Sequence, residues 1–159
     1  MGVDGLDSIT YYGSAANYNL GQNNNASHPW PQQNLNDYRR TIDFTGPASL
    51  ATAVTWGVPV TGGNAAQGRF TQNIRPPNTP NVPPANNTWA QQLEIWITPW
   101  GFLKGAAANQ ATLRPGALDN GERPTVISWN APLRSPGGQP YGVVGYIDAD
   151  NLVRRVETW

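Results

Sequence analysis

Hydrophobic and polar side chains alternate along residues 37–44, which predicts a strand with one buried face. Arg40 is the one charged residue on the face expected to be buried, which carries Tyr38, Arg40, Ile42 and Phe44. Gly46 and Pro47 interrupt the pattern. It resumes over residues 49–56, where one side carries Leu50, Thr52, Val54 and Trp56. Two alternating runs around a Gly-Pro interruption predict a β-hairpin.

Similar short runs predict five more strands, at residues 6–15, 69–74, 125–131, 141–148 and 151–159. The last two flank the sequence Asp148-Ala149-Asp150-Asn151, whose side chains favour a turn. Residues 19–34 are dominated by Asn and Gln and are expected to form a loop, and residues 75–87 contain five prolines. Because proline removes a backbone donor and fixes φ, we expect the second segment to be an exposed connection.

Residues 88–109 carry the one convincing helical pattern. Thr88 suits the N-cap, and one face carries Trp89, Leu93, Trp96 and Ile97. Pro99 ends this helix near Ile97 and suits the first turn of a second short helix. Strands on both sides of a helical insert predict an α+β, mainly β fold. We expect a curved, half-open barrel-like antiparallel sheet of about six or seven strands with the helical segment on its concave side.

Composition narrows the class of protein. A length of 159 residues suggests a single domain over 1–159. Ten basic and ten acidic residues cancel, which gives no charge-based case for nucleic acid as a partner. Without cysteine the chain has no disulfide and no thiolate metal site. No segment approaches the roughly 18 consecutive apolar residues of a membrane span.

Catalytic motifs are incomplete, so no residue is assigned a catalytic or metal-ligating role. His28 is the single histidine, too few for a hydrolytic zinc site. Asp148, Asp150 and Asn151 resemble the start of a calcium loop but lack its glycine and final glutamate. Neither a G-x-S-x-G elbow nor a phosphate-binding loop occurs. The pair Arg154-Arg155 is expected to be structural, with one side chain solvated and the other partly covered, and with Glu157 or Asp43 as a partner.

The aromatic residues near the helices are the most suggestive group. Trp89, Trp96, Trp100 and Phe102 lie within 14 residues. Aromatic side chains at helical spacing usually pack in a core. They also suit a groove for an apolar, lipid-like or carbohydrate ligand between helix and sheet. The candidate ligand-binding residues are therefore these four together with Arg40 and His28.

Three segments together resemble a known protein family. They are PWPQQNLNDYRRTIDFTGPAS (29–49), WAQQLEIWITPWGFLKGAAANQAT (89–112) and GYIDADNLVRRVETW (145–159). With the strand Ser8-Ile9-Thr10-Tyr11-Tyr12-Gly13, they look like the amino-terminal β-rich region of exported bacterial hydrolases that carry a metallo-β-lactamase-fold domain. The resemblance covers nearly the whole chain. Gly105 stands where the family pattern has alanine, a difference that slightly weakens a helix.

The resemblance implies a context without supplying a catalytic residue. The family's metal ligands lie in an H-x-H-x-D-H motif, which is absent from this sequence. The resemblance implies an exported, periplasmic or extracellular protein. The partner would be a carboxyl-terminal catalytic domain holding zinc or a similar metal, and the chain at hand would be truncated within its sheet. Such a truncation is expected to leave the last strand as an edge that pairs with another chain.

Three functions follow as alternatives. The first is a non-catalytic accessory domain that shapes substrate access to a metal-dependent hydrolase. The second is an autonomous binding module that holds an apolar or lipid-like ligand between Trp96, Trp100, Phe102 and the sheet. The third is a small α+β enzyme that uses Asp43, Arg40 or His28 in a polar pocket, which requires those side chains to converge.

Overall fold

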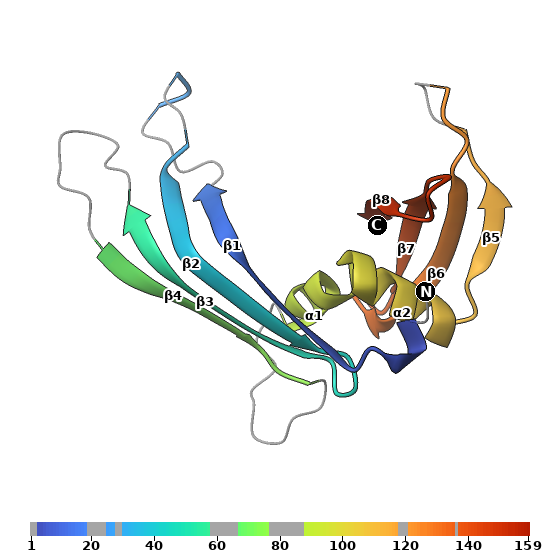
Figure 1. Ribbon diagram of the computed structural model, residues 1–159, viewed down its shortest axis with the longest axis horizontal. Helices are drawn as coiled ribbons and strands as arrows, with labels where there is room; N and C mark the ends of the chain where they lie inside the picture. The colour runs from blue at the N-terminus through green and yellow to red at the C-terminus, as the bar shows by residue number, and fades with distance from the viewer. Residues whose placement is uncertain are drawn as a thin grey trace. The chain divides into compact units, whose positions relative to one another are not determined.

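The computed structural model describes residues 3–18, 25–27, 30–57, 67–76, 88–117, 121–135 and 137–159. Within these residues the chain forms eight strands, in two antiparallel sheets of four, and two α-helices (Figure 1). The mainly β class predicted from the sequence is confirmed, with two four-stranded sheets in place of the single sheet expected. The two described sheets are not closed into a barrel.

The chain divides into two compact units. The β1–β4 unit comprises Ser8–Asp43 and Ser49–Asn73. The helix-containing unit comprises Met1–Asp7, Phe44–Ala48 and Ile74–Trp159. Each unit has its own four-stranded sheet.

The β1–β4 unit is a four-stranded sheet in the order of the sequence. Its strands are β1 (Ser8–Tyr18), β2 (Gln32–Asp43), β3 (Ala48–Gly57) and β4 (Gln67–Ile74). Figure 1 shows them side by side, with β2 curving along its length. The predicted hairpin is confirmed, because β2 and β3 are neighbours in the sheet.

The alternation predicted for residues 37–44 is confirmed. Arg40 and Ile42 are buried, whereas Asp37, Arg39 and Asp43 are exposed. In β3 the buried side carries the small residues Ser49, Ala51, Ala53 and Thr55. The opposite side, with Leu50 and Trp56, is the more exposed one. The large side chains of β3 therefore lie on the outer face of this sheet.

A β-bulge in this sheet interrupts the alternation of β2, which begins earlier than the sequence suggested. The β1–β2 register shifts between Gly13 and Ala15, and Asp37 has a positive φ of 50°. An extra residue on one strand reverses which positions face inward. Leu35 is accordingly buried at an odd-numbered position, although Arg40 and Ile42 are buried at even ones. Residues 32–34, expected to lie in a loop, belong to β2.

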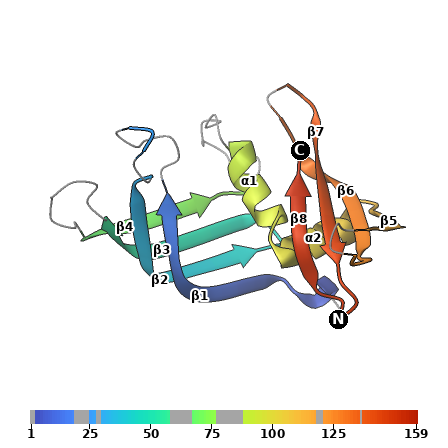
Figure 2. The same cartoon turned by 90° about the horizontal axis from the view of Figure 1, so that it is seen from above.

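The helix-containing unit combines a sheet with two consecutive helices. Its elements are η1 (Val3–Gly5), α1 (Thr88–Trp96), α2 (Pro99–Ala108), β5 (Thr112–Pro115), β6 (Thr125–Arg134), β7 (Pro140–Ile147) and β8 (Val153–Thr158). The strand order is β5-β6-β7-β8, with antiparallel pairing throughout. Both helices pack against β6. Figure 2 gives a second view of the helices beside this sheet. The sequence did not indicate β5, which is four residues long and exposed throughout.

Pro99 separates the two helices as predicted, and Thr98 is the N-cap of the second. The Thr98 hydroxyl accepts a hydrogen bond from the Gly101 N–H at 3.1 Å, and Pro99 occupies the first turn of α2. A threonine N-cap followed by proline is a favourable helix start because both satisfy or remove orphan donors. Ile97 falls after the end of α1 and is partly exposed, so it does not share the buried face predicted for it.

A buried glutamine fixes the start of the helical segment. Gln92 of α1 is almost fully buried, and its side-chain N–H₂ donates to the Pro47 carbonyl at 2.9 Å. The same amide also donates to the carbonyl of Arg75. These bonds join α1 to two segments that are distant in sequence. They also give the buried amide the acceptors without which its burial would destabilise the fold.

Candidate functional site

The aromatic residues of the helices form the core of the helix-containing unit. Trp96 and Phe102 are buried together with Trp129 of β6. The rings of Trp96 and Trp129 meet edge to face with centroids 6.0 Å apart, and Phe102 lies 6.2 Å from Trp129. Aromatic contacts of this kind stabilise a core by more than the burial of their apolar surface alone. Protein side chains therefore fill this space between helices and sheet.

Two glycines leave room for this packing. A Cβ placed on Gly105 of α2 would come within 2.1 Å of the Trp129 ring. A Cβ on Gly145 of β7 would come within 2.2 Å of the Phe102 ring. Each aromatic ring thus lies directly on the backbone of a neighbouring element. The absence of a Cβ at Gly105 therefore lets the Trp129 ring lie against α2.

Trp100 and Arg40 are the other candidate ligand-binding residues whose side chains the structure describes. Trp100 is 37% exposed, so it belongs to the surface of α2. His28 and the side chain of Trp89 lie outside the described residues. Arg40 belongs to the β1–β4 unit. The structure therefore brings together Trp96 and Phe102 from the candidate set and adds Trp129, which sequence reasoning missed.

Arg40 is held inside the β1–β4 unit. Its Nε donates to the Ser49 hydroxyl of β3 at 2.8 Å, and both residues are buried. Tyr11 lies opposite Arg40 in the β1–β2 register and packs on Tyr38 with ring centroids 6.2 Å apart. Burial raises the pKa of Tyr11, and the charge of Arg40 partly offsets that rise. The guanidinium thus links β2 to both neighbouring strands.

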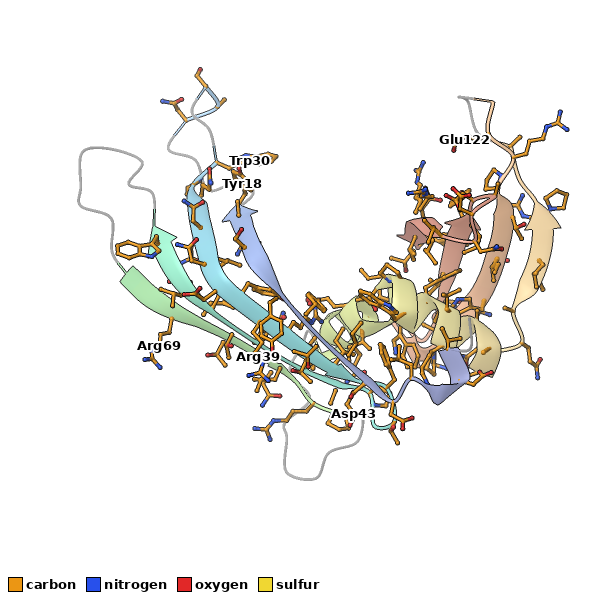
Figure 3. The ribbon with its side chains drawn as sticks, viewed as in Figure 1. Tyr18, Trp30, Arg39, Asp43, Arg69 and Glu122 are labelled. Carbon is orange, nitrogen blue, oxygen red and sulfur yellow. The ribbon has the colours of Figure 1, made fainter. Side chains whose placement is uncertain are left out.

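Asp43 and Arg40 lie on opposite faces of β2. They are three residues apart in a strand, where successive side chains alternate between faces. Asp43 is exposed and Arg40 is buried. Figure 3 labels Asp43 at the far end of β2 from Trp30, which lies two residues before the strand. The polar pocket that a small enzyme would need from Asp43 and Arg40 together is not formed by this geometry.

The β7–β8 turn forms a second feature, the turn cavity, of about 470 Å³. Its walls come from the segment before β6, from Tyr146 of β7, from the turn and from β8. The lining residues are Glu122, Arg123, Pro124, Tyr146, Asp148, Ala149, Asp150, Arg154 and Arg155. Glu122 is labelled in Figure 3. Charges of both signs line the cavity in equal number, so it carries no strong net field.

Asp148 organises the turn. One carboxylate oxygen accepts from the backbone N–H groups of Asp150 and Leu152, at 2.9 and 2.8 Å. The other oxygen pairs with Arg154. These bonds, that from Leu152 foremost, hold the pKa of the Asp148 carboxyl below its ordinary value. The predicted turn is confirmed, with Asn151 in the left-handed region at φ 61°.

Arg155 is linked to the same wall of the turn cavity. It pairs with Glu157 and lies 5.7 Å from the centre of the Tyr146 ring. The Tyr146 hydroxyl donates to Glu157 at 2.9 Å, and this bond raises the pKa of Tyr146. Arg155 has the Glu157 partner expected from the sequence, whereas Arg154 pairs with Asp148. Arg154 and Arg155 are both exposed, although one was expected to be partly covered.

Comparisons with known proteins leave the class of this chain open. No protein-family model, curated protein or solved structure matches it significantly. Among the described residues, no three His, Cys, Asp or Glu side chains form a group that could hold a metal ion. No helix within the described ranges is long and apolar enough to span a membrane.

Proposed function

We propose that this chain is a non-catalytic accessory region of an exported, metal-dependent hydrolase with a metallo-β-lactamase-fold domain. It would pack on that domain and shape the access of substrate to the metal. The metal, zinc or a similar ion, would belong to the catalytic domain. The family resemblance supports this proposal, and the nature of the residues that carry it supports the non-catalytic role.

One observation carries the argument. Several apolar positions in the resembling segments are core positions: Ile42, Phe44, Ile95, Trp96, Phe102 and Ile147 are all buried. Asp148 and Thr98 from the same segments stabilise a turn and a helix start. A pattern made of core and turn residues encodes a shared fold. It therefore fits a supporting region better than a reaction centre.

The filled aromatic core favours this proposal over the binding module. A ligand between Trp96, Phe102 and the sheet would have to displace Trp129, which is itself 5% exposed. Protein interiors are close-packed, and opening such a core is costly. The accessory role needs no opening of this kind.

Self-association of the isolated chain is part of the same proposal. Among the described strands, β8 lies at an edge of its sheet. Leu152 and Trp159, on either side of it, are exposed. An edge strand beside apolar side chains is a template for another strand. We propose that in isolation this edge pairs with β8 of a second copy.

The test begins with the reading frame after Trp159. We expect it to encode H-x-H-x-D-H. The parent protein is then purified with and without residues 1–159. Metal content and kcat/KM are measured on sulfate, phosphate and carboxylate esters and on a β-lactam. Deletion should leave the metal bound. It should change the KM of the larger substrates more than it changes the rate of hydrolysis of the smallest substrate. A frame without that motif, or stoichiometric zinc on the isolated chain, would contradict the proposal.

A further inference from the structure

A second cavity lies in the helix-containing unit, on the side of α2 that carries Lys104. It has a volume of about 310 Å³ and is lined by Asp4, Phe44, Trp96, Lys104, Ala107 and Ala108. We call it the Lys104 cavity. It is distinct from the turn cavity, and shares only Trp96 with the aromatic core.

The lining of the Lys104 cavity is divided by chemistry. Phe44, Trp96 and two alanines of α2 supply an apolar wall. Lys104 supplies a cation. Its ammonium has one hydrogen bond among the described residues, a long one of 3.5 Å to the Asp4 backbone carbonyl. A lysine ammonium has three donors, and a single long bond leaves it able to bind a further acceptor.

We propose that the Lys104 cavity binds a single-chain anionic amphiphile, with its apolar chain on Trp96 and Phe44 and its headgroup on Lys104. Ligand pockets combine an apolar lining with few polar groups that set orientation, and span about 300–1,000 Å³. This cavity, at about 310 Å³, is at the lower end of that range. It equals the volume of about ten waters, which suits a chain of about eight to ten heavy atoms. The inference does not depend on the proposed accessory role.

Asp4 is the one group in the lining that opposes an anion. Its backbone carbonyl accepts from Lys104, and its exposed side chain carries a negative charge near the same cavity. The Asp4 carboxylate repels an anionic headgroup, so Asp4 should reduce the affinity that Lys104 provides. The cavity therefore offers one substitution expected to weaken binding and one expected to strengthen it.

The sequence makes the measurement specific, because Lys104 is the only lysine of the chain. Incorporation of ¹³C-lysine labels Lys104 alone and leaves its ammonium unchanged. The labelled chain is titrated with decanoate and, separately, with decanol, below the concentrations at which either aggregates. We expect a saturable shift of the Lys104 Cε signal with decanoate. Decanoate titration without any shift of that signal would overturn the proposal.

Variants then separate charge from apolar contact. Lys104→Met keeps the helix propensity and the apolar stem. This variant should bind decanoate at least about fivefold more weakly, as measured by calorimetry, because one charge-assisted hydrogen bond is lost. Its affinity for decanol should stay unchanged. Asp4→Asn should tighten decanoate binding. Arg114→Met removes one positive charge from exposed β5 and should have no effect. Equal losses in Lys104→Met and Arg114→Met would mean general charge attraction and would refute the site.

The source of the amphiphile is tested with vesicles. A free amphiphile and a lipid surface share an anionic head and apolar chains. The chain is sedimented with phosphatidylglycerol vesicles and with phosphatidylcholine vesicles. Binding to monomeric decanoate without sedimentation on either vesicle supports the proposal as stated. Sedimentation on phosphatidylglycerol without decanoate binding would replace it with a membrane-surface contact and overturn it. Thermal melting of each variant checks that it is folded.

Discussion

At Gly145, a single added methyl group would have no room. A Cβ there would come within 2.2 Å of the buried Phe102 ring. Overpacking of a filled core typically costs about 1–3 kcal/mol. Gly145→Ala should therefore lower the free energy of unfolding in urea by about that amount. The matched control is Gly13→Ala in β1, where a Cβ meets nothing within 4 Å. An unchanged stability of Gly145→Ala would show that the ring can move aside.

Substitution of Gly105 by alanine should have two opposing effects on the stability of the chain. Alanine is favoured over glycine in a helix interior by about 1 kcal/mol. A Cβ at this position would come within 2.1 Å of Trp129, and overpacking costs about 1–3 kcal/mol. We expect packing to dominate, so that Gly105→Ala destabilises the chain in urea unfolding. A more stable Gly105→Ala variant would mean that helix propensity outweighs the contact with Trp129.

Asp148 makes the β7–β8 turn dependent on pH. Its carboxyl has a lowered pKa when folded, chiefly through the bond from the Leu152 N–H. The charged form therefore stabilises the fold above the ordinary aspartate pKa of about 4. That stability is lost as the pH falls through the lowered value. Asp148→Asn should melt below wild type at pH 7, with a gap that closes as the solution is acidified. Asp150→Asn, which removes a charge from the same turn, is the control; a constant gap would contradict the assignment.

The strands could be predicted wherever hydrophobic and polar side chains alternate without interruption. Residues 37–44 alternate cleanly, and Arg40 and Ile42 are buried there. The pattern fails before Asp37, because a bulge with a positive φ reverses the inward positions. A second irregularity lies between Asn130 and Arg134 of β6. Sequence alternation cannot reveal a bulge, because its cause is pairing with a distant strand.

The buried arginine of β2 provides a prediction for the β2–β3 pair. Arg40 donates to the Ser49 hydroxyl, and a hydrogen bond to a charged group contributes about 1.5–3 kcal/mol. Ser49→Ala should therefore lower the free energy of unfolding by about 1–3 kcal/mol. Thr52→Ala, on the exposed side of β3, should change it little. The double variant Arg40→Met with Ser49→Ala should recover part of the loss, since it removes the buried charge as well.

The candidate sites depend on contacts between residues that are far apart in sequence. They were therefore less predictable than the individual helices and strands. Trp96 and Phe102 were indicated by helical spacing, but their partner Trp129 lies more than twenty residues later in sequence. The turn cavity joins Arg123 to Asp148 and Arg154, which are brought together only by the pairing of β6, β7 and β8. The turn from Asp148 to Asn151 and the pairing of Arg155 with Glu157 were predicted, because both are local in sequence.

The edge of β8 tests the behaviour of the whole molecule in solution. Trp159 exchanges both backbone hydrogen bonds with Gly142 of β7. Hydrogen-bonded and non-bonded pairs alternate in an antiparallel ladder, so the N–H of the preceding Thr158 points away from β7. Thr158→Pro removes that outward donor and keeps the ladder to β7.

Sedimentation velocity over a range of concentrations should detect dimers of the wild-type chain and mainly monomers of Thr158→Pro. Leu113→Lys places a charge on β5 at the other edge of the same sheet and should leave the dimers unchanged. If Leu113→Lys abolishes association and Thr158→Pro does not, the partner binds β5 instead. A wild-type chain that stays monomeric at every concentration would remove the edge-pairing proposal. The accessory role, which is tested on the parent enzyme, would remain open.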